Sequence, residues 1–316
     1  MIGLIFPILM FILGLGMVVY SAEKLVKGVV ALSLRFGVSA FIISIIFIGF
    51  DPENLATGAA GSFENVYGIA LGSILGAAMV AIGLAFGITA LLAKIKFKKV
   101  SRQILLTPII ATILLYALSI DGVLSRIDGI LLIIAFIIAI IYLFKASKRG
   151  IDIKPEEELE ESLEEAEKLS KWRSVIIFVL SLAGIIIGSE LLVNGAKPII
   201  QFLGISDTVF GMTILAFLIS IEELARELPA ARKGRADISY GNVAGSIFHF
   251  FLLNAGIIAL VNPIQISPVV LTFYFPIVLA TIIFTSLVMI KKEVPKWAGV
   301  ILVLFYVLFI LKGYLI

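Results

Sequence analysis

The chain has 316 residues, of which 61% are hydrophobic, and its formal net charge is only +3. A mean hydropathy of +1.16 excludes a soluble domain of ordinary composition. The chain contains no cysteine, which excludes disulfides and thiolate metal sites. It has neither a Walker sequence nor H-E-x-x-H, which argues against an ATP-driven pump and an intramembrane zinc protease.

Apolar segments of about 20 residues, the length that an α-helix needs to cross a bilayer, recur along the whole chain. We predict an all-α membrane protein with ten transmembrane helices. The predicted spans are 2–22, 36–58, 67–93, 104–120, 127–145, 174–193, 205–230, 240–261, 266–290 and 295–315. The first span lacks a basic n-region and a cleavage site, so we expect it to be retained.

The basic residues are distributed unevenly between the two sides that these spans define. Of the 25 lysines and arginines, only Arg126, Lys197 and Lys312 lie on one side, and all the others lie on the opposite side. The positive-inside rule predicts that the basic side is cytosolic and that both termini lie outside the cell membrane.

The chain divides into two halves that share sequence. We predict a first five-helix repeat at 1–145, a cytosolic acidic linker at 146–173 and a second five-helix repeat at 174–316. Segment 21–28 aligns with 188–195, and segment 67–74 aligns with 240–247. Because each half has an odd number of spans, the second copy would be inverted, as in many secondary transporters with a substrate site near the midplane.

The linker is rich in glutamate, and Leu159, Leu163 and Ala166 follow one another at helical spacing within it. It is either a solvated helical connection or a surface that collects cytosolic cations with low affinity.

Each half contains a span that is interrupted by acidic residues. Pro52 predicts a helix break beside Glu53, and Glu223 occupies the related place in the second half. Carboxylates at membrane depth usually face a cavity or a partner and mark an ion path. Glu53 and Glu223 are therefore the predicted ion-binding residues and metal ligands. The alternative for either one is an interhelical hydrogen bond.

Calcium binds 6–8 oxygen ligands in flexible geometry, and carbonyls freed at a break would add to the two carboxylates. The empty carboxylates would repel each other, so protons would compete with the metal for the same oxygens. Asp51 and Glu222 are either ligands or polar contacts at a break or a mouth, because on a regular helix they point away from Glu53 and Glu223. The candidate auxiliary ligands are Asp51, Asn54, Ser73, Ser220, Glu222, Asn242 and Ser246. The small and polar residues among them are equally suited to helix packing.

Other polar residues lie near these segments. His249 is the only histidine and is either a proton relay or gate, or a packing residue. Arg226 and Glu227 lie one turn beyond Glu223 and form either a cytoplasmic gate or an interfacial ion pair. The glycines near the interruptions, such as Gly68 and Gly72, are expected to permit close helix approach.

Two pairs of segments resemble the α-repeats of the calcium/cation antiporter superfamily. They are Pro52-Glu53 with the segment 68–73, and segment 220–224 with segment 241–246. The resemblance covers nearly the whole chain. It implies two inverted five-helix halves and alternating access by sliding of the first and sixth spans.

In sodium/calcium exchangers, further polar ligands follow the second segment, at the positions of Ile74, Ala77, Ile247 and Phe250, which are all apolar here. The chain therefore resembles a small prokaryotic or archaeal proton/calcium exchanger.

The sequence thus predicts a secondary antiporter of the cell membrane, and not an enzyme, that exports Ca2+ from the cytosol in exchange for H+. It predicts no cofactor apart from the transported Ca2+, no nucleic-acid partner and no obligate protein partner. The alternatives are a Na+/Ca2+ exchanger on the same fold, a passive divalent-cation channel and a membrane scaffold without transport.

Overall fold

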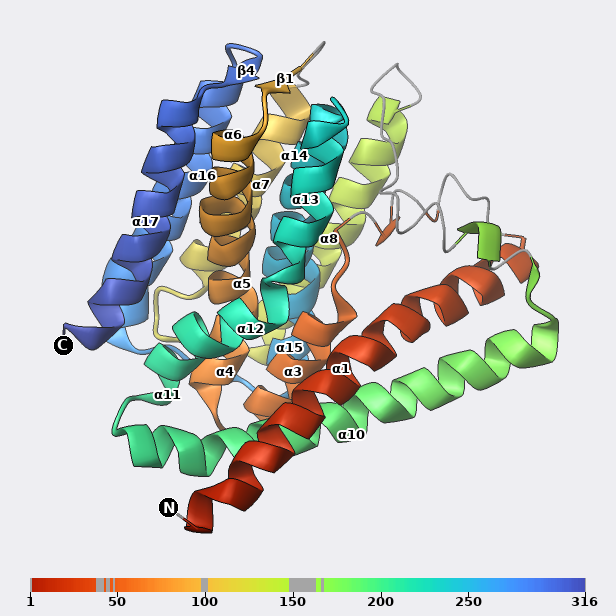
Figure 1. The fold of residues 1–316 in the computed structure, drawn as a ribbon, viewed down its shortest axis with the longest axis vertical. Helices are drawn as coiled ribbons and strands as arrows, with labels where there is room; N and C mark the ends of the chain where they lie inside the picture. The colour runs from red at the N-terminus through yellow and green to blue at the C-terminus, as the bar shows by residue number, and fades with distance from the viewer. Residues whose placement is uncertain are drawn as a thin grey trace.

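The computed structural model describes residues 2–37, 43, 46–47, 49–97, 102–147, 163–165 and 168–315, and almost all of this part of the chain is helical (Figure 1). In the labels that follow, η marks a π-helical segment. Up to Ser147 the helices are α1 (Ile2–Arg35), α3 (Pro52–Phe63), α4 (Tyr67–Leu71), η1 (Gly72–Gly76), α5 (Ala77–Met79), η2 (Val80–Ala85), α6 (Phe86–Leu92), α7 (Arg102–Leu118) and α8 (Arg126–Ser147).

From Lys171 onward the chain is again almost entirely helical. They are α10 (Lys171–Leu203), α11 (Asp207–Val209), η3 (Phe210–Leu215), α12 (Ala216–Ser220), α13 (Glu222–Arg232), α14 (Ala236–Phe248), η4 (His249–Asn254), α15 (Ala255–Val261), η5 (Val270–Tyr274), α16 (Phe275–Met289) and α17 (Lys296–Tyr314).

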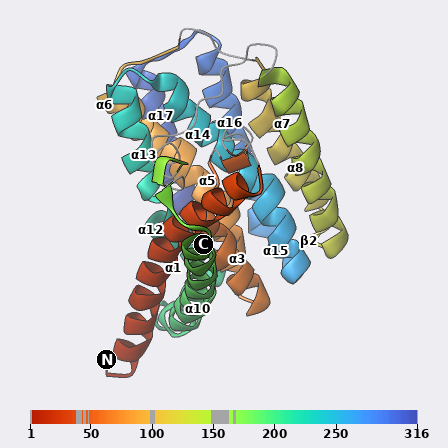
Figure 2. The same ribbon diagram turned by 90° about the vertical axis from the view of Figure 1, so that its right-hand side faces the viewer.

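Two helices, α1 and α10, pack against each other and run diagonally across one side of the bundle (Figures 1 and 2). Glycines allow this close approach, because a Cβ at Gly14, Gly188 or Gly195 would overlap backbone atoms of the opposite helix. Near its C-terminal end α10 is also linked to the rest of the bundle, where Lys197 Nζ lies 2.6 Å from Glu64 Oε2.

The continuous helical stretches Tyr67–Leu92 and Ile238–Val261 form the centre of the molecule. In each of them, 83% of the residues in an apolar 18-residue segment are buried. In the equivalent segments of α1 and α8 only 17% of the residues are buried. The apolar surface of α1 and α8 therefore remains available to lipid. The central helices approach their neighbours closely: a Cβ at Gly68 or Gly72 would overlap the backbone around Asp207 or Gly211. The predicted role of these two glycines in close packing is confirmed.

In the described ranges, four two-residue strands connect turns that are far apart in the sequence. Strand β1 (Ile95–Lys96) pairs antiparallel with β4 (Glu293–Val294), and β2 (Val123–Leu124) pairs antiparallel with β3 (Ile264–Gln265). The β1–β4 pair carries an exposed ion pair in which Lys96 Nζ lies 3.2 Å from Glu293 Oε2.

Among the described residues, seven helices are long and apolar enough to cross a membrane, and the bent pair α11–α13 makes an eighth. This agrees with an all-α membrane protein. The count of ten and the inverted relation between the halves stay predictions, in part because much of the predicted span 36–58 lies outside the described residues.

The helix that contains the first predicted span, α1, continues to Arg35, beyond the predicted end of that span at residue 22. The charged residues beyond residue 22 form ion pairs and do not end the helix. Lys27 Nζ lies 3.0 Å from Glu23 Oε1 and 3.1 Å from Glu165 Oε2 of the predicted linker. Leu163 also packs near Val30 of α1, while most of the linker, including Leu159 and Ala166, lies outside the described residues.

Candidate functional site

The first interruption has the backbone that its sequence predicts. Helix α3 begins at Pro52, and Asp51 at the N-cap position is extended, with φ −115° and ψ 92°. Gly49 has a φ of +67°, and a Cβ there would overlap the Ser246 nitrogen and the Gly245 backbone. A glycine is therefore required at this position, both for its left-handed conformation and for the close approach to α14. The predicted break at Pro52 is confirmed.

The second interruption separates α12 from α13. Helix α12 ends at Ser220, α13 begins at Glu222, and the two helices are bent by 49° relative to each other. The bend places an acidic pair in the first turn of α13, Glu222 and Glu223, where the positive end of the helix dipole favours carboxylates.

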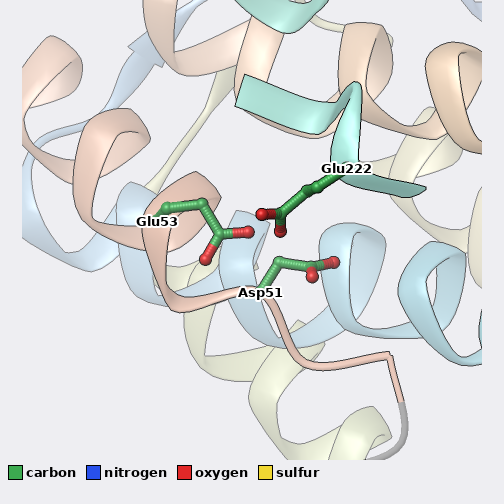
Figure 3. Close-up of side chains that lie close together, drawn as sticks. All are labelled: Asp51, Glu53 and Glu222. Atoms are coloured by element: carbon green, nitrogen blue, oxygen red, sulfur yellow. The ribbon is translucent and has the colours of Figure 1, made fainter. Parts of the chain in front are cut away.

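Three carboxylates from these two interruptions converge (Figure 3). Oxygens of Asp51, Glu53 and Glu222 all lie within 4.8 Å of one another. Asp51 and Glu53 are buried, with exposed fractions of 1% and 2%, whereas Glu222 is partly exposed. The expectation that Asp51 points away from Glu53 is wrong, because Asp51 is extended and regular helical periodicity does not apply to it. Glu222 does diverge from Glu223, as expected, and joins Asp51 and Glu53 instead.

Two oxygens of this cluster lack a hydrogen-bond donor. Asp51 Oδ2 and Glu53 Oε1 are buried and accept no hydrogen bond from any residue that the structure describes. An ionised carboxylate buried in this way is costly unless a cation or a proton compensates it. The arrangement is therefore suited to holding a positively charged species.

Arg226 lies at one edge of the cluster. Its Nη1 donates to Asp51 Oδ1 at 2.6 Å, and its Nη2 donates to Glu222 Oε1 at 2.8 Å. The guanidinium thus connects α13 to the extended residue before α3. Glu227, the expected partner of Arg226, is buried on the same helix.

Glu223 lies outside the three-carboxylate group and is held by α14. Asn242 Nδ2 donates to its Oε2 at 2.6 Å, and Ser246 Oγ donates to its Oε1 at 3.1 Å. Asn242 Oδ1 is buried and accepts no hydrogen bond from the described part of the chain, so this amide oxygen can contact a cation. Asn242 and Ser246 therefore contact a predicted ion ligand, and their own role as auxiliary ion ligands stays a prediction.

The remaining candidate ligands differ in how they lie. Asn54 and Ser220 bond to each other, with Asn54 Nδ2 3.3 Å from Ser220 Oγ, and so connect the two interruptions. Ser73 Oγ donates to the Ala70 carbonyl within its own helix at 2.9 Å, and its side chain packs close to Gly58.

His249 connects α14 and η4 to the segment before the first break. Its Nδ1 lies 2.9 Å from the Gly245 carbonyl, and its Nε2 lies 2.8 Å from the Ile46 carbonyl. Phe50, Phe136 and Phe248 surround the ring. This geometry fits the packing role that the sequence left open beside the relay.

A cavity of about 150 Å³ adjoins the carboxylates. It is lined by Glu53, Glu222 and Arg226, and on its other side by Ala22, Glu23 and Val26 of α1. An ion that reaches Glu53 through this cavity passes between α1 and the two interruptions.

Sequence reasoning missed that Arg226 bridges Asp51 and Glu222. The i,i+4 spacing of Glu222 and Arg226 was a signal for half of this contact. No local signal connects Arg226 to Asp51, because the two residues are far apart in the chain.

Comparison with known proteins gives the same assignment as the residues. The family model described as sodium/calcium exchanger protein matches residues 6–145 and 173–313. An uncharacterized membrane protein of Methanocaldococcus jannaschii is 34% identical over 75% of this chain and 76% of its own length. The sodium/calcium exchanger MaX1 of Methanosarcina acetivorans is 27% identical over 96% of this chain and 97% of its own.

Among solved structures, the sodium-calcium exchanger NCX_Mj soaked with Na+ and Sr2+ is 27% identical in sequence to this chain. It matches with a TM-score of 0.61 over 98% of this chain and 99% of its own. The interrupted spans, the buried carboxylates and these matches together show that the chain belongs to the sodium/calcium exchanger protein family, within the calcium/cation antiporter superfamily.

Proposed function

We propose that this protein is a secondary antiporter that exports Ca2+ from the cytosol in exchange for H+. The observation that carries the proposal is the pair of buried oxygens, Asp51 Oδ2 and Glu53 Oε1, that no protein donor satisfies. In an apolar bundle such oxygens require a cation or a proton. A carrier that binds Ca2+ in one state and protons in the other would compensate these oxygens in both states.

The oxygen ligands fit a hard divalent cation. Glu53 and Glu223 are the proposed primary ligands, one from each interruption. Asp51, Glu222 and the free Asn242 amide oxygen supplement them, and an ion with 6–8 ligands in flexible geometry, such as Ca2+, suits a set drawn from separate elements. No histidine or cysteine belongs to the set, which disfavours zinc and copper.

Protons are the proposed counter-ion because the polar ligands expected of a sodium site are missing. Ile74, Ala77, Ile247 and Phe250 are all buried and apolar. A proton needs only a carboxylate oxygen, whereas a sodium ion needs several oxygen ligands. With these four positions apolar, the carboxylates themselves must alternate between the metal and protons.

The transport cycle that we propose uses two inverted five-helix halves with ten spans in the cell membrane and both termini outside. The helices α1 and α10 would slide together against the remaining bundle, as their mutual glycine packing allows. In this orientation the cavity beside Glu23 opens toward the cytosol. His249 would hold the first break in place, and Arg226 would form part of a cytosolic gate.

Exchange of Na+ for Ca2+ on the same scaffold is the second candidate. It is favoured by the relatives, since MaX1 and NCX_Mj are both sodium/calcium exchangers by name.

Uptake of calcium-45 into proteoliposomes distinguishes the candidates. The uptake is measured with an imposed pH gradient, with an imposed sodium gradient and with neither, while potassium and valinomycin clamp the voltage. Uptake driven by the pH gradient alone is the expected result. Uptake driven by sodium alone would replace the proposal with its rival, and equal uptake in all three conditions would indicate a channel.

A further inference from the structure

We propose that Arg226 is a tethered cation that occupies a cation subsite formed by Asp51 and Glu222, and so sets the affinity of the site for the transported ion. The inference rests on the proposed function, because it concerns the same carboxylates. It assigns Arg226 a role in setting the Ca2+ affinity of the site, which differs from gating.

The contacts of Arg226 resemble those of a bound ion. One guanidinium reaches two different carboxylates, Asp51 at 2.6 Å and Glu222 at 2.8 Å, through separate nitrogens. The side chain of Asp51 is 1% exposed and that of Arg226 is 19% exposed, so water screens this contact only weakly. Arginine stays protonated at any physiological pH, so this positive charge is permanent.

The cluster nevertheless keeps negative charge for a mobile ion. Asp51 Oδ2 and Glu53 Oε1 accept no hydrogen bond, and the cavity beside Glu53 is shared by Arg226. A metal that binds there meets a fixed positive charge bonded to two of the carboxylates that it would otherwise use. Arg226 therefore competes with the metal, and it also compensates the carboxylates when the site is empty.

This competition has a functional consequence. A carrier that must release Ca2+ needs a site that is not too strongly attractive. A guanidinium that returns to Asp51 and Glu222 as the metal leaves would assist release. Because it is covalently attached, it supplies a positive charge that would otherwise have to come from an additional counter-ion.

The test is calcium binding to the purified full-length protein in sodium-free detergent, measured by titration calorimetry. Replacement of Arg226 with glutamine removes the competing charge and is expected to tighten Ca2+ binding by at least about tenfold. Arg232 is exposed in the last turn of the same helix, and R232Q serves as the matched control with unchanged affinity. Unchanged or weaker binding in R226Q would overturn the inference.

Chemical rescue separates competition from a merely structural role. In Arg226→Ala, added methylguanidinium should weaken Ca2+ binding back toward the wild-type value and leave wild-type binding unaffected. If this compound has no effect on Arg226→Ala, the guanidinium does not occupy a cation subsite.

The conservative variant R226K tests the inference even if R226Q and Arg226→Ala do not fold. R226K keeps the charge but replaces the planar guanidinium, whose two nitrogens each contact one carboxylate, with a single nitrogen, and it is expected to bind Ca2+ a few fold more tightly than the wild type. Weaker binding in R226K would contradict the inference. If the wild type binds no Ca2+ at all, the proposed function fails; if it binds and R226Q matches it, only the role of Arg226 fails.

Discussion

Neutralising Glu53 is predicted to stabilise the metal-free protein while abolishing its response to Ca2+. The Glu53→Gln side chain has nearly the same shape but cannot ionise. Glu53 lies within 4.8 Å of both Asp51 and Glu222. At that distance and an effective dielectric constant of about 20, two carboxylates repel each other by about 3.5 kcal/mol.

The net gain is smaller than the sum over both neighbours. Arg226 carries a compensating charge, and Glu222 is partly exposed, with 30% of its side chain accessible. We expect E53Q to raise the free energy of unfolding by about 1–3 kcal/mol at alkaline pH, where the wild-type carboxylates are ionised.

The assay is thermal unfolding in detergent, with and without Ca2+, over a range of pH. Calcium should raise the melting temperature of the wild type and leave that of E53Q unchanged, because a ligand stabilises only the state that binds it. Glu64→Gln is the matched control, since Glu64 pairs with Lys197 at the other end of α3 and should keep the calcium response. A destabilised E53Q that still responds to Ca2+ would refute the electrostatic reasoning.

Two further predictions concern the backbone and the partners of Glu223. Gly49→Ala should abolish transport and destabilise the protein, since its Cβ would overlap the Gly245–Ser246 backbone. Gly37→Ala has a similar φ of +79°, but its Cβ would meet no described atom within 4 Å, and it should cost only about 1–2 kcal/mol in thermal unfolding with transport retained. Equal behaviour of the two variants would contradict the close-approach argument. Asn242→Ala removes a charge-assisted donor to Glu223 and should weaken Ca2+ binding by about 10- to 100-fold in calorimetry. Asn262→Ala removes a part-buried donor to the Ser62 carbonyl and no contact with Glu223, and it should leave Ca2+ binding unchanged. Normal binding by Asn242→Ala would exclude its role in positioning Glu223.

The positions of the two interruptions were predictable because their signals are local. Pro52 cannot continue a helix from the preceding segment, and the acidic residues after Ser220 do not belong in an uninterrupted apolar span. The structure places the start of α3 and the bend between α12 and α13 at these residues.

The choice of carboxylates that meet was not predictable from helical periodicity. A regular helix turns by a fixed angle per residue, which separates Glu222 from Glu223 and Asp51 from Glu53. At the first break this rule fails, because Asp51 is extended. In α13 the rule holds, but the bend before this helix brings Glu222, and not Glu223, to Asp51 and Glu53. The contact between Arg226 and Asp51 depends on tertiary structure alone.

The full length of α1 was also not predictable from the sequence. Lys24 and Lys27 suggested an end near residue 22, since charges usually mark the membrane surface. Their partners, Glu23 and the distant Glu165, could not be identified as a group from the sequence. Beyond residue 22 helix α1 also packs on α10, where Gly28 lies against the Phe178 backbone.

The central claim is that Ca2+ and protons compete for the same buried carboxylates. It is tested most directly by the protons released when Ca2+ binds to the purified protein in sodium-free solution. Calorimetry at one pH in buffers of different ionisation enthalpy measures this release. We predict proton release with each calcium ion bound by the wild type, together with weaker binding as the pH falls. Calcium binding without proton release, at an affinity independent of pH, would contradict the account.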